Sequence, residues 1–142
     1  MEMAIAEARA AAAADEVPVG CVIVRDGEVV ASAHNRTIRD HDPTAHAEIL
    51  AIRAAARALG TERLTECDIY VTLEPCAMCA GAMIHSRIDR LVFAAADPKT
   101  GAAGSVLAVI NHPQLNHQMQ VEQGILAEES AELIRSFFQA RR

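Results

Sequence analysis

The chain has 142 residues, a net charge of −6 at pH 7 and only 3% aromatic residues, with no tryptophan. This length suits a single domain, residues 1–142, with enough chain to bury one core. The few aromatic residues argue against a module that binds RNA by stacking bases on exposed rings. The acidic balance argues against nonspecific nucleic-acid binding, although it leaves room for a local basic patch.

The amino-terminal residues, MEMAIAEARA, lack the basic segment and the long apolar run of a signal peptide. No apolar stretch is long enough to cross a membrane. Four cysteines in such a chain favour metal binding or catalysis over disulfide bonds. We therefore expect a cytoplasmic protein with no membrane partner.

Apolar residues recur in short runs whose patterns alternate between those of helices and those of strands. In chain order we expect a helix at 2–14, strands at 17–24 and 28–34, a helix at 42–60, a strand at 68–73, a helix at 75–86, a strand at 90–95, a loop at 97–105, a short strand at 118–124 and a helix at 127–142. Asp26–Gly27 is typical of a hairpin turn between the first two strands. The alternation predicts an α/β fold with a mixed sheet and helices on both of its faces.

Two short motifs, HAE at 46–48 and PCAMC at 75–79, carry the residues of a metal site. Cys76 and Cys79 are three residues apart, so on a helix they share one face. They fall in the first turn, where the positive end of the helix dipole favours thiolates. With His46 from another helix they make three ligands for tetrahedral zinc and leave the fourth position open, which favours catalysis. Glu48 can then move the proton of a water activated by the metal without itself being a ligand.

Each motif alone is weak evidence, because histidine and glutamate near helix starts are often capping or surface residues. Cys21 or Cys67 as a fourth ligand would make the zinc structural, and iron could also occupy a site of two cysteines and one histidine. His85 is more often a packing residue than a ligand. The combination of HAE and PCAMC, each at the start of a helix that follows a strand, favours catalytic zinc.

HxE followed by PCxxC resembles the signature of the zinc-dependent nucleobase and nucleoside deaminases. The similarity continues through EVPVGCVIV, HNRTIRDHDPTAHAEILAIR, YVTLEPCAMCAGAMIHSRI and VEQGILAEE, and covers nearly all of residues 16–142. The stretch KTGAAGS resembles the branch that acts on tRNA, the bacterial tRNA adenosine deaminases. The resemblance implies a cytidine deaminase-like, three-layer α/β/α sandwich around a mixed five-stranded sheet. It also implies a homodimer with one Zn²⁺ per subunit.

By this resemblance, His46, Cys76 and Cys79 match the zinc ligands, and Glu48 matches the residue that shuttles protons. The implied reaction is hydrolytic deamination of the wobble adenosine, position 34 of a tRNA anticodon stem-loop, to inosine. The family's default substrate is tRNA-Arg. The target base lies in a loop and is flipped into the pocket, which costs least where it is already unpaired.

Three further residues match family positions that face the RNA. Asn35 matches a contact to the target nucleotide, although asparagine is also a common turn residue at a strand end. Asp97 and Lys99 match positions near the RNA backbone and the flanking nucleotides, although a lone loop charge is more commonly just solvated. A local basic rim could be formed by Arg36, Arg39, Lys99, Arg141 and Arg142.

Three other functions remain as alternatives. A deaminase of free guanine, cytosine or a nucleoside would have the same fold, and KTGAAGS argues against it. A zinc-stabilised subunit without catalytic activity would have no use for Glu48 beside its metal. A pure RNA-binding module is disfavoured by the acidic charge and the few aromatic residues.

Overall fold

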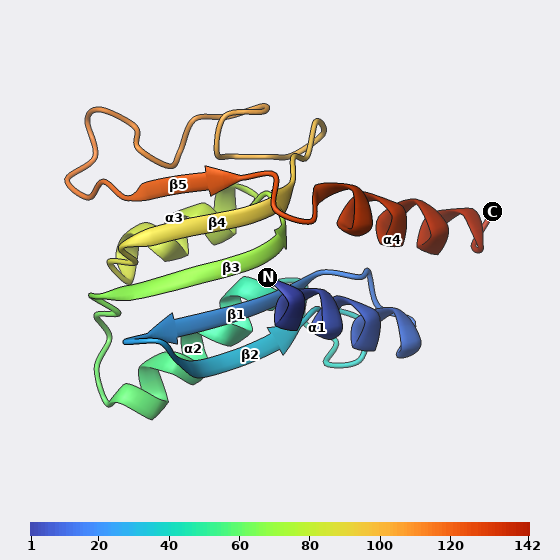
Figure 1. The fold of residues 1–142 in the computed structure, drawn as a ribbon, viewed down its shortest axis with the longest axis horizontal. Helices are drawn as coiled ribbons and strands as arrows, with labels where there is room; N and C mark the ends of the chain where they lie inside the picture. Colours follow the sequence, from blue (N-terminus) through green and yellow to red (C-terminus); the bar gives the residue numbers. More distant parts are fainter.

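The computed structural model describes residues 1–142 and contains five strands and four helices. Figure 1 shows their arrangement. In chain order the elements are α1 (Glu2–Ala13), β1 (Gly20–Arg25), β2 (Glu28–His34), α2 (Ala47–Leu59), β3 (Cys67–Leu73), α3 (Ala77–His85), β4 (Arg90–Ala95), β5 (Gln120–Gln123) and α4 (Ala127–Gln139).

The five strands form one mixed sheet in the order β2-β1-β3-β4-β5. β1 is antiparallel to both of its neighbours, β2 and β3, whereas β3, β4 and β5 are parallel to one another. β2 and β3 therefore run in the same direction although β1 lies between them (Figure 1). The mixed five-stranded sheet expected from the sequence is confirmed.

Helices cover both faces of this sheet, which confirms the three-layer arrangement. α2 packs against β1, β2 and α3 on one face, and α1 packs against the other face together with α4. α4 extends past the edge of the sheet where β3, β4 and β5 end (Figure 1). None of the four helices combines the length and the apolar composition that a membrane span requires.

The hairpin expected at Asp26–Gly27 is present. The two residues form the whole loop between β1 and β2, with φ angles of 51° and 77°. Positive φ at both positions is the type I′ geometry, whose twist matches that of paired strands. Gly60, at φ 67°, ends α2 in the left-handed conformation, as a glycine at that place predicts.

The expected helix at 42–60 is wrong in its first five residues, because α2 begins only at Ala47. The side chain of Asp42 accepts hydrogen bonds from the backbone N–H and the hydroxyl of Thr44, at 2.8 and 2.7 Å. This local turn satisfies groups that a helix would otherwise have to satisfy. His46 consequently stands just before the helix, in an extended conformation, rather than within its first turn.

α1 lies close to the sheet at Gly20 because small residues face each other at the contact. Ala4 and Ala8 of α1 are fully buried, and they lie over Gly20, the first residue of β1. A Cβ atom on Gly20 would lie 2.0 Å from the carbonyl oxygen of Ala4 and 2.6 Å from the backbone nitrogen of Ala8. Backbone atoms of a packed helix cannot move aside, so this glycine sets the spacing between α1 and the sheet.

Gly20→Ala is expected to destabilise the protein by about 1–3 kcal/mol, the usual range for overpacking a core. Chemical denaturation followed by circular dichroism measures the change. Gly81→Ala is the matched control, since a Cβ there meets nothing within 4 Å. In α3 that change should leave stability unaltered or raise it, by up to about 1 kcal/mol. Equal losses from both variants would contradict this account of Gly20.

Candidate metal centre and active site

The topology of the sheet brings the two sequence motifs together. Because β2 and β3 run in the same direction, their carboxyl ends lie at the same edge of the sheet. α2 and α3 follow these strands and begin at that edge. His46 is the residue directly before α2, Cys76 is the residue directly before α3, and Cys79 lies in the first turn of α3.

The side chains of His46, Cys76 and Cys79 converge on one point. Nδ1 of His46 lies 3.6 Å from Sγ of Cys76 and 3.5 Å from Sγ of Cys79. The three ligand atoms all lie within 4.8 Å of one another. Cys79 is fully buried, whereas His46 and Cys76 are half-buried. The structure therefore gathers the three metal ligands expected from the sequence.

No fourth histidine, cysteine or carboxylate belongs to this group. Cys67 begins β3, whereas the site lies beyond the end of that strand, roughly 20 Å away at the usual rise per strand residue. Cys21 is fully buried in the hydrophobic core, and burial raises its pKa well above the usual value. Neither completes a closed structural site, so the fourth coordination position stays open.

Hydrogen bonds among His46, Cys76 and Cys79 shift the pKa values of all three side chains. Hydrogen bonds to Cys76 from the thiol of Cys79 and from His46 lower the pKa of Cys76 to about 4. The hydrogen bond with Cys76, together with burial, raises the pKa of Cys79. The hydrogen bond to Cys76 also raises the pKa of His46. A metal ion bound by the three side chains would replace these hydrogen bonds. Two sulfurs and one imidazole nitrogen are a donor set that fits Zn²⁺.

Glu48 lies beside this group, one helical position past Ala47, and is only 4% exposed. Burial raises the pKa of its carboxyl to about 7. A carboxyl whose pKa lies near neutrality can both accept and release a proton during one reaction. Because Glu48 does not belong to the group of possible ligands, it remains available for proton transfer.

Asn35 follows β2 directly and is 9% exposed. Its side-chain oxygen accepts a hydrogen bond of 2.9 Å from the backbone N–H of Ala47, the first residue of α2. Ala47 stands between His46 and Glu48, so this bond orients the backbone that carries both. The amide NH₂ of Asn35 makes no hydrogen bond to the protein and is free for a ligand.

Asp97 and Lys99 lie together in the loop after β4. The carboxylate of Asp97 accepts hydrogen bonds from the backbone of Lys99 and from Thr100, and so closes a tight turn. The ammonium group of Lys99 is exposed and makes no ion pair. Asp97 therefore shapes the loop, while Lys99 presents an unpaired positive charge at its surface.

Basic residues of α4 approach the same loop. Lys99 lines a cavity of about 540 Å³ together with Arg135, Arg141 and Arg142. Arg141 is held there by an ion pair with Asp15 at 2.8 Å and by its position over the ring of Phe137. Arg135 is also paired, with Glu132 at 2.7 Å, so Lys99 and Arg142 are the members of this group that make no ion pair.

Two buried carboxylates near the site were missed by the sequence analysis. Glu74 is 3% exposed, stands directly before Pro75, and binds the loop that carries Lys99. Glu16 is 1% exposed and binds the loop that leads to His46. The sequence offers only weak signals for Glu74: it follows an apolar strand, and the loop that it binds contains a glycine, Gly101.

A comparison with family models places residues 1–95 in a match to the cytidine and deoxycytidylate deaminase zinc-binding region. These residues include every side chain of the metal group and Glu48. Among curated proteins, the tRNA-specific adenosine deaminase of Agrobacterium fabrum is 51% identical over 142 residues. This alignment covers all of the present chain and 93% of that relative.

Solved structures give a consistent result. One structure comes from a study of tRNA:A34 deaminases, which edit A to I at the wobble position of transfer RNA. Its sequence is 51% identical to this chain, and it superimposes with a TM-score of 0.90, covering 94% of this chain and 96% of that one. The guanine deaminase of Nitrosomonas europaea is 26% identical and has a TM-score of 0.83, covering 96% of this chain and 81% of that one. The fold is thus shared widely, whereas the higher sequence identity is to an enzyme that edits tRNA.

His46→Ala is expected to abolish stoichiometric zinc binding, because it leaves two ligands where catalytic zinc sites have three. Metal content per chain, measured by inductively coupled plasma mass spectrometry after dialysis, tests this. His85→Ala is the control, since His85 is exposed and lies outside the metal group. Retention of one zinc per chain in His46→Ala would contradict the assignment.

Proposed function

Because this chain belongs to the cytidine and deoxycytidylate deaminase family, we propose that it is a zinc-dependent hydrolase that converts the wobble adenosine of a tRNA anticodon, position 34, to inosine. The observation that carries the proposal is the group of three ligands with an open fourth position beside a buried carboxyl. The strong likeness to tRNA-specific adenosine deaminases, along the whole chain, supports the choice of substrate. The weaker likeness to a guanine deaminase makes a free-base substrate the less favoured alternative.

In this proposal His46, Cys76 and Cys79 hold one Zn²⁺. Zinc at such a site supplies an activated water for attack on C6 of adenine. Glu48 accepts the proton of that water and delivers protons to the ring nitrogen and to the departing amine. The balance is one water consumed and one ammonia released for each inosine formed. The low exposure of Glu48 keeps bulk water away from these transfers.

The same proposal gives Asn35, Asp97 and Lys99 roles in binding the substrate. The free NH₂ of Asn35 can donate a hydrogen bond to the target nucleotide while its oxygen holds the start of α2. Lys99 can contact an RNA phosphate, because it is exposed and unpaired. Asp97 fixes the turn that presents Lys99, and in this proposal it would lie beside the flanking nucleotides.

Arginine tRNA is the proposed substrate, and the cytoplasm is the proposed location. All four cysteines are free, and the metal group needs reduced thiols, which a reducing compartment maintains. We also propose that residues 1–142 act as one deaminase domain. Strands from β1 to β5 share a single sheet, and one cluster of 20 buried residues spans it.

The test uses an anticodon stem-loop of arginine tRNA with adenosine at position 34 and follows the formation of inosine. Glu48→Gln keeps the size of the side chain but removes the group that carries the proton. Its kcat should fall by about 10²–10⁴-fold, the usual contribution of general acid–base catalysis. Zinc content should stay at the wild-type level, which separates proton transfer from metal binding.

A stem-loop with guanosine at position 34 serves as the negative substrate, and free guanine, cytosine and nucleosides are tested in parallel. Turnover of a free base by wild-type protein, without turnover of the stem-loop, would support the alternative function. Tight zinc binding without turnover of any of these substrates would support a subunit that has no catalytic activity.

A homodimer is the proposed assembly. Large apolar side chains are exposed on α3 and on the segment after Gly104, and Leu115 of that segment lines a cavity together with residues of α3. They are Met78, Val106, Leu107 and Leu115. Apolar side chains gathered on one face of a protein commonly mark an interface.

Leu107→Asp is expected to convert the dimer to a monomer, because it replaces an exposed apolar side chain of the proposed interface by a charged one. Size-exclusion chromatography with light scattering measures the mass. Met3→Glu on α1, at a position that is also exposed, is the control and should leave the dimer intact. A wild-type protein that is monomeric at micromolar concentration would overturn the proposal.

A further inference from the structure

Two loops border the metal group, and each is hydrogen-bonded to the residue that precedes a metal ligand. In the first loop, the backbone N–H of Arg36 donates to the carbonyl of Ala45, next to His46, at 3.0 Å. In the second, the backbone N–H of Ala102 donates to the carbonyl of Pro75, next to Cys76, at 2.8 Å. Each loop is therefore attached to the backbone beside a metal ligand.

The second loop is organised around the buried carboxylate of Glu74. Its Oε1 accepts a hydrogen bond from the backbone N–H of Asp97 at 3.0 Å, and its Oε2 accepts from those of Ala103 and Ser105 at 2.9 and 3.1 Å. The hydroxyl of Ser105 donates to Oε1 as well. These hydrogen bonds hold both ends of the segment that contains Lys99, and they lower the pKa of Glu74 although burial opposes them.

The loop makes room for the carboxylate of Glu74 by having a glycine at position 101. A Cβ atom on Gly101 would lie 2.4 Å from Cδ and 2.5 Å from Oε2 of Glu74. The loop passes so closely over the carboxylate that only glycine fits at position 101. Backbone groups of the loop therefore surround the carboxylate of Glu74 on several sides and hold it in place.

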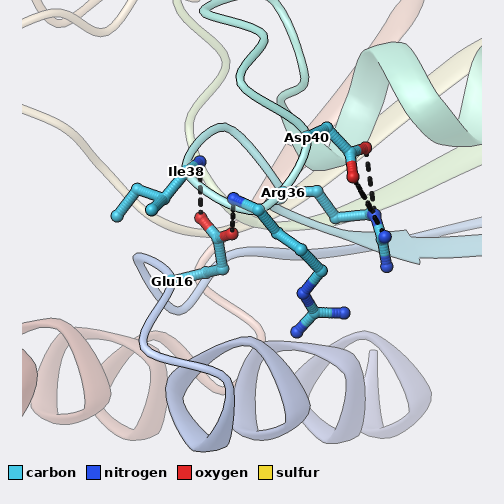
Figure 2. A network of polar contacts seen from close by, with 5 residues as sticks. Glu16, Arg36, Ile38 and Asp40 are labelled. Atoms are coloured by element: carbon cyan, nitrogen blue, oxygen red, sulfur yellow. Dashed lines mark hydrogen bonds and ion pairs between the residues drawn. The ribbon is translucent and has the colours of Figure 1, made fainter.

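Glu16 does the same for the first loop. Its two carboxylate oxygens accept hydrogen bonds from the backbone N–H groups of Ile38 and Arg39, at 3.2 and 2.8 Å. Figure 2 shows Glu16 below this loop and, apart from it, the ion pair of Arg36 with Asp40, at 3.0 Å. The side chain of Arg39 is exposed and makes no ion pair with the protein.

We propose that Glu16 and Glu74 are positioning residues, each of which fixes one of the two loops that receive the RNA beside the metal group. Neither touches the reacting atoms. Each acts through backbone N–H groups and sets the place of cationic side chains, Arg39 in one loop and Lys99 in the other. This inference rests on the proposed function for its substrate, whereas the anchoring of the loops is independent of it.

Hydrogen–deuterium exchange of the zinc-loaded protein, without substrate, tests the anchoring. Glu74→Gln replaces one carboxylate oxygen by an NH₂ group, which cannot accept the hydrogen bonds that this oxygen accepts from the loop. Exchange of backbone amides should therefore rise in residues 97–105 and not in 36–42. Glu16→Gln should give the reverse pattern, so that each variant controls for the other. Zinc content should remain one per chain in both.

Kinetics on the anticodon stem-loop test the positioning role. For each variant kcat/KM should fall by about 10–100-fold, the usual effect of losing a residue that orients an active-site group. The loss should appear mainly as a higher KM, because the loops bind RNA while Glu48 and the ligands stay in place. A residue with a merely structural role would lower the amount of folded protein and leave KM unchanged.

Two further variants disturb the second loop while the carboxylate of Glu74 stays intact. Ser105→Ala removes one donor to Glu74, and Gly101→Ala pushes the loop off an intact carboxylate. Both should change exchange and KM in the same direction as Glu74→Gln. Exchange that rises equally in both loops, or an unchanged KM in all four variants, would overturn the proposal. Absence of inosine from wild-type protein would refute the proposed substrate instead, and the exchange result would still stand.

Discussion

The site depends on the common direction of β2 and β3. β1 returns between them, so both strands end at one edge of the sheet, and the helices that follow both begin there. His46 and Cys76 are 30 residues apart in the chain, yet each takes the last extended position before a helix. If β2 were reversed, His46 would lie at the opposite edge, and no adjustment of side chains could bring it to the two cysteines.

The site is costly without its metal. Cys76, Cys79 and Glu48 place three acidic groups close together. Burial raises the pKa of Glu48, and the hydrogen bond with Cys76, together with burial, raises the pKa of Cys79. A divalent cation would remove this cost by stabilising both thiolates, and in the proposed reaction it would provide the field in which Glu48 exchanges protons. Burial thus disfavours the charged forms of these side chains without a metal ion, and it would strengthen their interaction with a bound one.

The sequence predicted the metal group because its chemistry depends on side-chain type and spacing, which are visible in HAE and PCAMC. It predicted the elements because apolar runs and turn residues such as Asp26–Gly27 act locally. It placed the start of α2 wrongly because the helical pattern continues through residues 42–46, where the turn between Asp42 and Thr44 prevails.

Glu16 and Glu74 could not be recognised in the same way. Their partners are backbone N–H groups, which every residue except proline has, so no pattern of residue types reveals them. A glutamate beside a strand is usually taken for a surface residue, and its burial becomes visible only when the distant loop is in place. The structural role of Asn35 was hidden for the same reason. Its side-chain oxygen accepts a hydrogen bond from a backbone N–H at the start of α2, 12 positions away in the chain.

The position of these carboxylates also explains how an acidic protein can present a surface to RNA. Three of its 19 acidic residues, Glu16, Glu48 and Glu74, are buried and contribute little negative charge to the surface. Two of them lie beneath the loops whose outer sides carry Arg39 and Lys99. Each loop therefore directs backbone N–H groups inward to a carboxylate and cationic side chains outward to solvent. The net charge of −6 describes the whole chain, whereas an approaching phosphate responds to the local arrangement, within about one Debye length, roughly 10 Å.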